Sequence, residues 1–146
     1  MVPILLAVKR KSLILFGGLS LCALLAYFAL GPGLYYWKEH AHHYESGANS
    51  DLLALHAIQQ NYKEDHGSFA SSFSQLGVPL GAHLDGDVLT WGGPYRFRFT
   101  RTVRDRNGIL VGYEIEGRAD SNSAWKLPAL SIDESGKIHR QKTSCN

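Results

Sequence analysis

The sequence predicts an α+β fold in which an N-terminal transmembrane helix continues into an amphipathic helix that packs on a small antiparallel β-sheet. Three observations predict this fold. Residues 12–30 contain no charged side chain, residues 37–62 carry apolar side chains at steps of three and four, and residues 95–103 and 109–116 alternate between apolar and polar side chains. Steps of three and four are typical of one helix face, and alternation is typical of a strand with one buried face.

The apolar run at residues 12–30 has the length of a transmembrane helix, because roughly 19 residues at about 1.5 Å each nearly span a bilayer core. Lys9, Arg10 and Lys11 precede the run directly, and such basic clusters hold that end of a span in the cytoplasm. The alternative for the same run is a cleaved signal peptide, which also combines a basic start with an apolar segment.

These features divide the chain into a basic cytoplasmic N-terminus (1–11), a span with an interfacial aromatic belt (12–37) and an extracytoplasmic domain (38–146). The location we expect is a bacterial inner membrane, crossed once, with the C-terminal domain in the periplasm or outside the cell. The whole chain has 15 basic and 13 acidic residues, and three of the basic ones precede the span. The remainder is nearly neutral, which gives no electrostatic case for nucleic-acid binding.

A second helix, over residues 49–66, is the best-marked element beyond the span. Asn49 or Ser50 can cap its start, and Gly67 provides a left-handed stop. The apolar stripe keeps its phase from Trp37 to Tyr62, so one long, bent helix explains the pattern better than two separate helices. The residues expected on its core face are Leu52, Leu55, Ile58 and Tyr62.

The next residues predict a loop at 77–87, a short strand at 88–91 and then a hairpin. A three-residue hairpin loop at 106–108 places Val103 opposite Val111 and keeps apolar side chains on one face. The same loop sets Phe99 opposite Ile115, Arg98 opposite Glu116 and Thr100 opposite Glu114. The residues expected on the core face of the sheet, including the last hairpin, are Tyr95, Phe97, Phe99, Val111, Tyr113, Ile115, Ile132 and Ile138.

A second hairpin closes the chain, with strands at 130–133 and 137–140. A loop at 134–136 sets Ile132 opposite Ile138. Residues 120–127 form a polar connection in which Trp125 is expected to anchor into the core.

Few residues suggest chemistry. His40 and His43 lie one helical turn apart and form a weak, open candidate for a zinc or copper site. Asp120 and Asp133 are candidate calcium ligands if the connection at 120–127 folds toward the last hairpin, although the spacing of a dedicated calcium loop is missing. A solvated surface segment and turn-forming residues are the respective alternatives, and no cofactor is otherwise expected.

Motifs for catalysis are missing from the sequence: it has no nucleophile elbow, no HExxH and no glycine-rich phosphate loop. His56 and His66 are expected to face solvent or to cap a helix end. Arg96 and Arg98 are expected to pair with glutamates across the strands.

The order of elements resembles that of the type IV pilins and the pseudopilins of type II secretion. Residues 54–76, with Tyr62, Gly67 and Phe69, are similar to the helix-end pattern of pilin-like proteins, and residues 95–100 and 132–138 are similar to their C-terminal sheet. The start of the span departs from the family, which carries a glycine before the first mature residue and a glutamate at the fifth. Lys11 and Phe16 stand at these places.

The resemblance implies a non-enzymatic, membrane-anchored structural or assembly component of a pilus or secretion system. Its partners would be the membrane and other proteins, including copies of itself, contacted through the N-terminal helix. The alternative is an anchored binding module that does not polymerise and holds a ligand in the loops at 77–87 and 120–127. An enzyme is the least favoured class.

Overall fold

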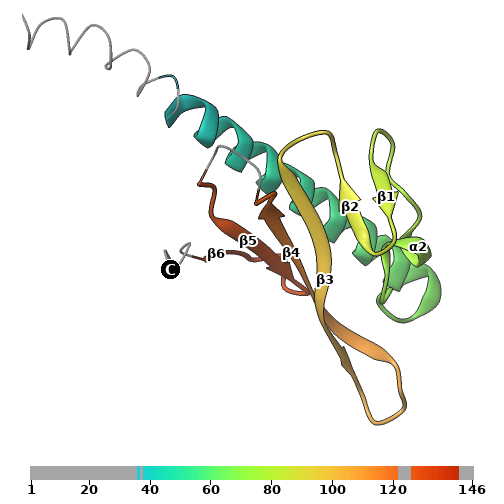
Figure 1. Cartoon of the computed structure of the whole chain (residues 1–146). Coiled ribbons are helices and arrows are strands. Elements are labelled where there is room, and N and C mark those ends of the chain that lie inside the picture. The colour runs from blue at the N-terminus through green and yellow to red at the C-terminus, as the bar shows by residue number, and fades with distance from the viewer. Residues whose placement is uncertain (1–35, 37, 122–125, 142–146) are drawn as a thin grey trace, which may run out of the picture. The chain divides into compact units, whose positions relative to one another are not determined.

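The structure, a computed structural model, describes Tyr36 and residues 38–121 and 126–141 (Figure 1). The chain divides into two compact units, Met1–His40 and Ala41–Asn146, and only the second is described nearly in full. A long helix covers residues 38–66. After it come α2 (Phe73–Leu76), β1 (His83–Asp85), β2 (Val88–Thr90), β3 (Tyr95–Arg104), β4 (Leu110–Ala119), β5 (Ala129–Asp133) and β6 (Ile138–Gln141).

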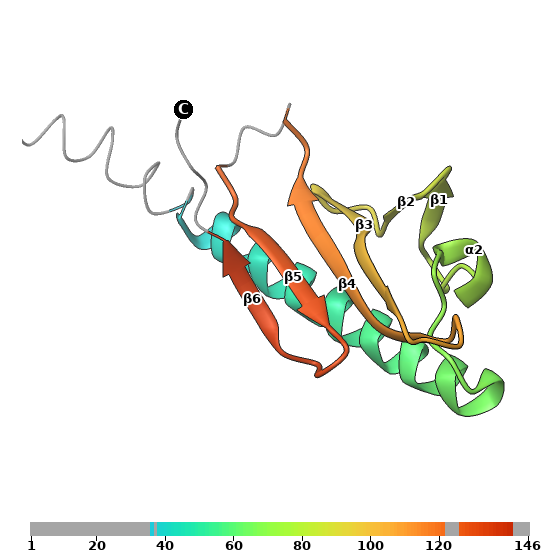
Figure 2. The same ribbon diagram turned by 90° about the horizontal axis from the view of Figure 1, so that it is seen from below.

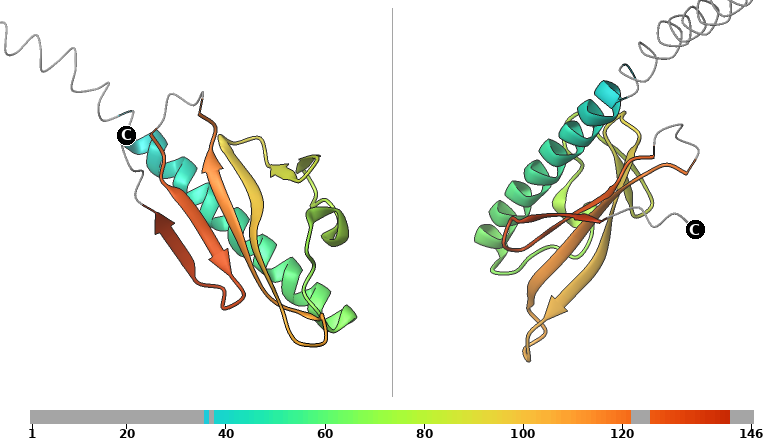
Figure 3. Two further views of the ribbon diagram at one scale, coloured as in Figure 1. Left: turned by 60° about the horizontal axis from the view of Figure 1, so that its bottom comes forward. Right: turned by 90° about the vertical axis from the view of Figure 1, so that its left-hand side faces the viewer.

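The six strands form one antiparallel sheet in which each strand pairs with its neighbours in sequence, in the order β1-β2-β3-β4-β5-β6. The long helix lies across one face of this sheet, as Figures 2 and 3 show. The core lies between them and includes Ala48, Leu52, Leu55, Phe69, Phe73, Leu89, Tyr95, Phe97, Leu110, Tyr113, Ile115, Leu130 and Ile132. Alternate strand residues therefore point away from the helix, onto the outer face of the sheet.

No helix among residues 36, 38–121 and 126–141 is long and apolar enough to cross a membrane. The long helix carries charged residues along its length, among them Lys38, Glu45 and Lys63. This finding contradicts the membrane-spanning part of the predicted fold class and the predicted single-pass location in an inner membrane, and we correct both. The run at 12–30 lies outside the described residues, as does Trp37.

The helix face that meets the sheet follows steps of three and four from Ala48 through Leu52 and Leu55 to Gln59, all buried. Ile58 and Tyr62, expected on the same face, are half-buried. The polar Gln59 is accommodated because its side chain bonds the backbone of Ala70 twice. Its Nε2 donates to the carbonyl of Ala70 at 3.0 Å, and its Oε1 accepts from the amide of Ala70 at 3.0 Å.

The β3–β4 hairpin departs from the predicted register in its outer half. Phe99 pairs with Ile115 and Arg98 with Glu116 as predicted, but Arg101 then pairs with Glu114 in place of Thr100. A second irregularity leaves Val103 opposite Gly112 instead of Val111. Two β-bulges, one on each strand, produce these shifts.

The loop of this hairpin explains the second bulge. It spans residues 105–109, because the carboxylate of Asp105 accepts hydrogen bonds from the amides of Asn107 and Ile109, at 2.8 and 2.9 Å. Leu110 consequently faces the core at 3% exposure, and Val111, expected on the core face, is 45% exposed. The predicted three-residue loop is therefore wrong.

The other hairpins are simpler. The predicted pairing of Ile132 with Ile138 is confirmed, although β6 begins at Ile138, one residue later than predicted. The stretch 77–87, expected to be a loop, contains β1, which pairs with β2 across a two-residue turn, Gly86 and Asp87. The remaining residues of the predicted sheet face lie in or against the core: Tyr95, Phe97, Tyr113 and Ile115 are buried, and Phe99 packs against the buried cluster. Residues 122–125, with Trp125, lie outside the described part of the chain.

Candidate binding face of the sheet

The outer face of the sheet carries two rows of polar residues in cross-strand register. The first row runs from Arg98 on β3 through Glu116 and Ser131 to His139 on β6. The second row consists of Arg101, Glu114 and Asp133. Residues directly opposite on one face have Cβ atoms about 5 Å apart, so each row brings side chains of opposite charge next to one another.

Three ion pairs form on this face. Arg96 binds Asp120 at 2.6 Å, Arg118 binds both carboxylate oxygens of Glu116 at 2.7 and 2.9 Å, and His139 lies 3.2 Å from Asp133. All three pairs are partly exposed to solvent, and such pairs contribute roughly 0–1 kcal/mol each. They order the side chains of the face without fixing them strongly.

Two shallow depressions lie next to each other along the strands of this face. One has a volume of about 440 Å³ and is lined by Arg96, Arg98 and Arg118 together with Glu116 and Asp120. It therefore carries an excess of positive charge. The other has a volume of about 370 Å³ and is lined by Arg101, His139 and the carboxylates of Glu114, Asp133 and Glu134, so it carries an excess of negative charge.

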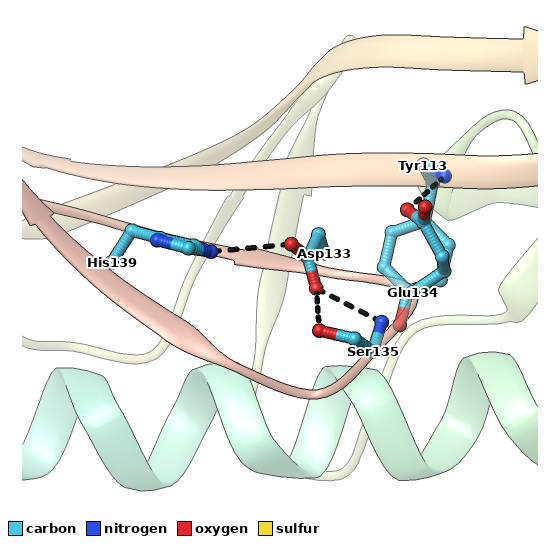
Figure 4. Close-up of polar contacts among 5 residues, drawn as sticks. All are labelled: Tyr113, Asp133, Glu134, Ser135 and His139. Carbon is cyan, nitrogen blue, oxygen red and sulfur yellow. Dashed lines mark hydrogen bonds and ion pairs between the residues drawn. The ribbon is translucent and has the colours of Figure 1, made fainter.

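The β5–β6 turn positions the acidic side chains of the second depression (Figure 4). The Oδ1 atom of Asp133 accepts hydrogen bonds from the hydroxyl and the amide of Ser135, and its Oδ2 atom faces Nε2 of His139. These interactions lower the pKa of Asp133, and the hydrogen bond from the Ser135 hydroxyl makes the largest contribution. Burial has a smaller, opposite effect on this pKa. The carboxylate therefore stays ionised at neutral pH.

Glu134 reaches from the same turn to β4, as Figure 4 shows. Its Oε2 atom accepts the amide of Tyr113 at 3.3 Å, beyond the last residue of β4 that pairs with β5. Gly112 leaves room for this carboxylate, since a Cβ atom there would lie 3.2–3.3 Å from it. The bulge, the glycine and the carboxylate thus form one local arrangement.

The other side of the turn meets the long helix. His56 was expected to face solvent, but it is half-buried and its Nδ1 atom lies 2.6 Å from the hydroxyl of Tyr113. Burial is the main cause that raises the pKa of Tyr113, so its hydroxyl stays protonated and can donate to the imidazole. Gly136 has φ 76° and passes so close that a Cβ atom would lie 2.9 Å from Nε2 of His56.

The candidate metal ligands do not come together. No group of three His, Cys, Asp or Glu side chains suited to a metal ion occurs within the described ranges. Asp120 lies just past the C-terminal end of β4, and Asp133 pairs with Glu114 in the middle of that strand. Asp120 is six residues after Glu114, so along the strand direction it lies roughly 20 Å from Asp133. His43 is exposed and His40 half-buried, both on the long helix.

Ser131 lies on this face but was not among the residues predicted to form a site. It is only 1% exposed, and its hydroxyl has no hydrogen-bond partner among the described residues. Its neighbours Leu130 and Ile132 are buried in the core, so by alternation Ser131 points to the outer face, where it lines the acidic depression.

No family model, curated protein or solved structure matches this chain. The resemblance to pilins and pseudopilins therefore stays an interpretation of the sequence. The comparisons hold nothing that links the chain to a pilus or to type II secretion, and with no membrane-spanning helix among the described residues those assignments are corrected and not carried further.

The geometry of the face also bears on catalysis. Ser131, His139 and Asp133 are the three residue types of a hydrolytic triad, and His139 does contact Asp133. However, the Ser131 hydroxyl makes no hydrogen bond with His139. A nucleophilic serine needs a hydrogen-bonded base, so this trio lacks the arrangement of a triad.

Proposed function

We propose that this domain is a non-enzymatic protein-binding module that contacts its partner through the outer face of the sheet. The observation that carries the proposal is the uneven distribution of charge along this face: arginines outnumber carboxylates in one depression, and carboxylates outnumber basic side chains in the other. The function expected from the sequence also included contacts with other proteins. Such contacts do not require a membrane-spanning segment.

Charge separation favours a protein partner over a small molecule. From Arg96 to Arg101 the β3 strand extends roughly 15 Å, so the two depressions together form a surface longer than one small ligand covers. A protein surface with charges in the opposite order would match both depressions, and such complementarity speeds association and selects the partner. The rigid sheet holds these charges in fixed register.

The ion pairs on this face are exposed, so groups of a partner can replace one member of each pair. Each contributes little in water, so a partner can replace Asp120 on Arg96, or Glu116 on Arg118, at small cost. Arg98 and Arg101 take part in no ion pair within the described residues, although each lies opposite a glutamate. Their guanidinium groups are ready to bind carboxylates of a partner.

A crosslinking comparison tests the proposal. The full chain, an Arg98→Glu variant and an Arg106→Glu variant would each be crosslinked in cells and purified. Arg106 is an exposed residue of the β3–β4 loop, away from the outer face, so its reversal matches the change in charge. We expect the wild type and Arg106→Glu to give the same crosslinked proteins and Arg98→Glu to lose them. Equal crosslinking of all three proteins would overturn the proposal.

A further inference from the structure

We infer that the acidic depression on the outer face is a site for the ammonium group of a lysine side chain from the partner. This inference rests on the proposed function and makes it specific, because it names the chemical group that the acidic depression accepts.

The net charge of the depression determines the charge of the group that it can bind. Three carboxylates, from Glu114, Asp133 and Glu134, line it together with a single guanidinium, that of Arg101. The three carboxylates outnumber the two basic side chains, Arg101 and His139, so the balance of charge is negative. Glu114 and Asp133 are directly opposite each other on β4 and β5, so their carboxylates approach one point from two strands.

The Ser131 hydroxyl supplies an observation independent of the acidic side chains. It lies buried in the lining of the depression and has no hydrogen-bond partner among the described residues. A buried hydroxyl without a partner is unfavourable. A hydroxyl can both donate and accept, so a donor bound in the depression would give the Ser131 oxygen a hydrogen bond that no described residue supplies.

The occupied oxygens favour an ammonium over a guanidinium. Both oxygens of Asp133 already take part in contacts, with Ser135 and with His139. Its carboxylate therefore cannot offer the two free, parallel oxygens that an arginine needs for a bidentate bond. An ammonium has three donors on a compact centre and needs only single acceptor sites, which Glu114, Ser131 and the remaining lone pair on Oδ2 of Asp133 supply.

Titration of the labelled full chain by NMR tests the site, with Nα-acetyl-lysine amide as the probe. The corresponding amides of arginine and of norleucine, which lacks the charge, serve as comparisons. We expect saturable shifts of the amides of Glu114, Ser131 and Asp133 with the lysine probe, weaker binding of the arginine probe, and no saturation with norleucine.

The decisive variant is Ser131→Ala, with Ser121→Ala as its control in the positive depression of the same face. Removal of an unpartnered hydroxyl does not harm folding, so the variant stays testable. We expect it to bind the lysine probe about tenfold more weakly and Ser121→Ala to bind like the wild type. Equal affinity of the two variants, or equal binding of lysine and norleucine, would overturn the inference.

The crosslinking comparison and the NMR titration test different claims, so each can give a negative result without the other. Crosslinking that depends on Arg98, combined with no lysine binding, would reject only the lysine site. Lysine binding at Ser131 without any crosslinking that depends on Arg98 would reject docking of a protein through the positive depression and leave a site for small cations.

Discussion

Replacement of Gln59 by leucine should destabilise the domain more than any other change of a polar helix residue. Gln59 is fully buried, and its amide bonds both the N–H and the C=O of Ala70, which is itself buried. Leucine has a similar volume, so the expected loss comes from the polar groups and not from a cavity. Each buried group left without a partner costs roughly 1–3 kcal/mol, and the two Ala70 groups together give about 3 kcal/mol.

The assay is thermal unfolding of the full chain, followed by far-ultraviolet circular dichroism. A loss of about 3 kcal/mol would lower the melting temperature by on the order of 10–20 °C for a domain of this size. Gln60→Leu is the matched control, because Gln60 is half-buried and its bonds are long, at 3.4 Å. It should cost less than about 1 kcal/mol.

A second variant separates the hydrogen bonds from packing. Gln59→Glu keeps an acceptor for the amide of Ala70 but loses the donor and places a charge in the core. Its destabilisation should decrease as the pH falls and the carboxyl becomes protonated, because a buried carboxylate is far more costly than the neutral acid. The reasoning would be refuted if Gln59→Leu and Gln60→Leu had equal stability, or if Gln59→Glu showed no dependence on pH.

Three further predictions concern the sheet. Gly117→Ala should cost about 1–3 kcal/mol in thermal unfolding, since its Cβ atom would lie 2.7 Å from the ring of Phe97. Gly112→Ala should cost about 1 kcal/mol and much less in a Glu134→Ala background, because the new methyl group displaces that carboxylate. The lowered pKa of Asp133 stabilises the fold above its unfolded value of about 3.9, and this contribution disappears as the pH falls through the folded pKa. The urea midpoints of wild type and Asp133→Asn should therefore converge on acidification from pH 6 to pH 3.

Each of these predictions has a contrary outcome. An unchanged melting temperature for Gly117→Ala would mean that the ring of Phe97 moves freely within the core. Additive costs for Gly112→Ala and Glu134→Ala would show that the two residues do not interact. A difference between wild type and Asp133→Asn that grows in acid would mean that the ionised carboxylate does not stabilise the turn.

The strands and hairpins were predictable where alternation and turn chemistry act locally. Tyr95, Phe97 and Ile115 alternate with polar residues, and this pattern is sufficient to indicate the strands and the inner half of the register. The outer half depends on Asp105, whose carboxylate widens the loop. β1 is only three residues long, His83–Asp85, and so short a strand shows no recognisable alternation of apolar and polar residues.

The candidate site was harder to predict because its determinants are not local. Gln59 looks like a surface residue until the chain returns to place Ala70 beside it. His56 likewise obtains its partner, Tyr113, 57 residues further along. Ser131 has the expected alternation of an outward residue, but its burial results from neighbours on β4 and β6.

The bond from the Tyr113 amide to Glu134 has a consequence for self-association. β4 extends past β5, since its last pair is Glu114 with Asp133, and an exposed strand edge of this kind can recruit a strand from a second chain. Glu134 occupies the edge at Tyr113 and places a negative charge there. We expect this carboxylate to hinder edge-to-edge pairing with a second chain, so its removal should shorten the time for which concentrated protein stays monomeric.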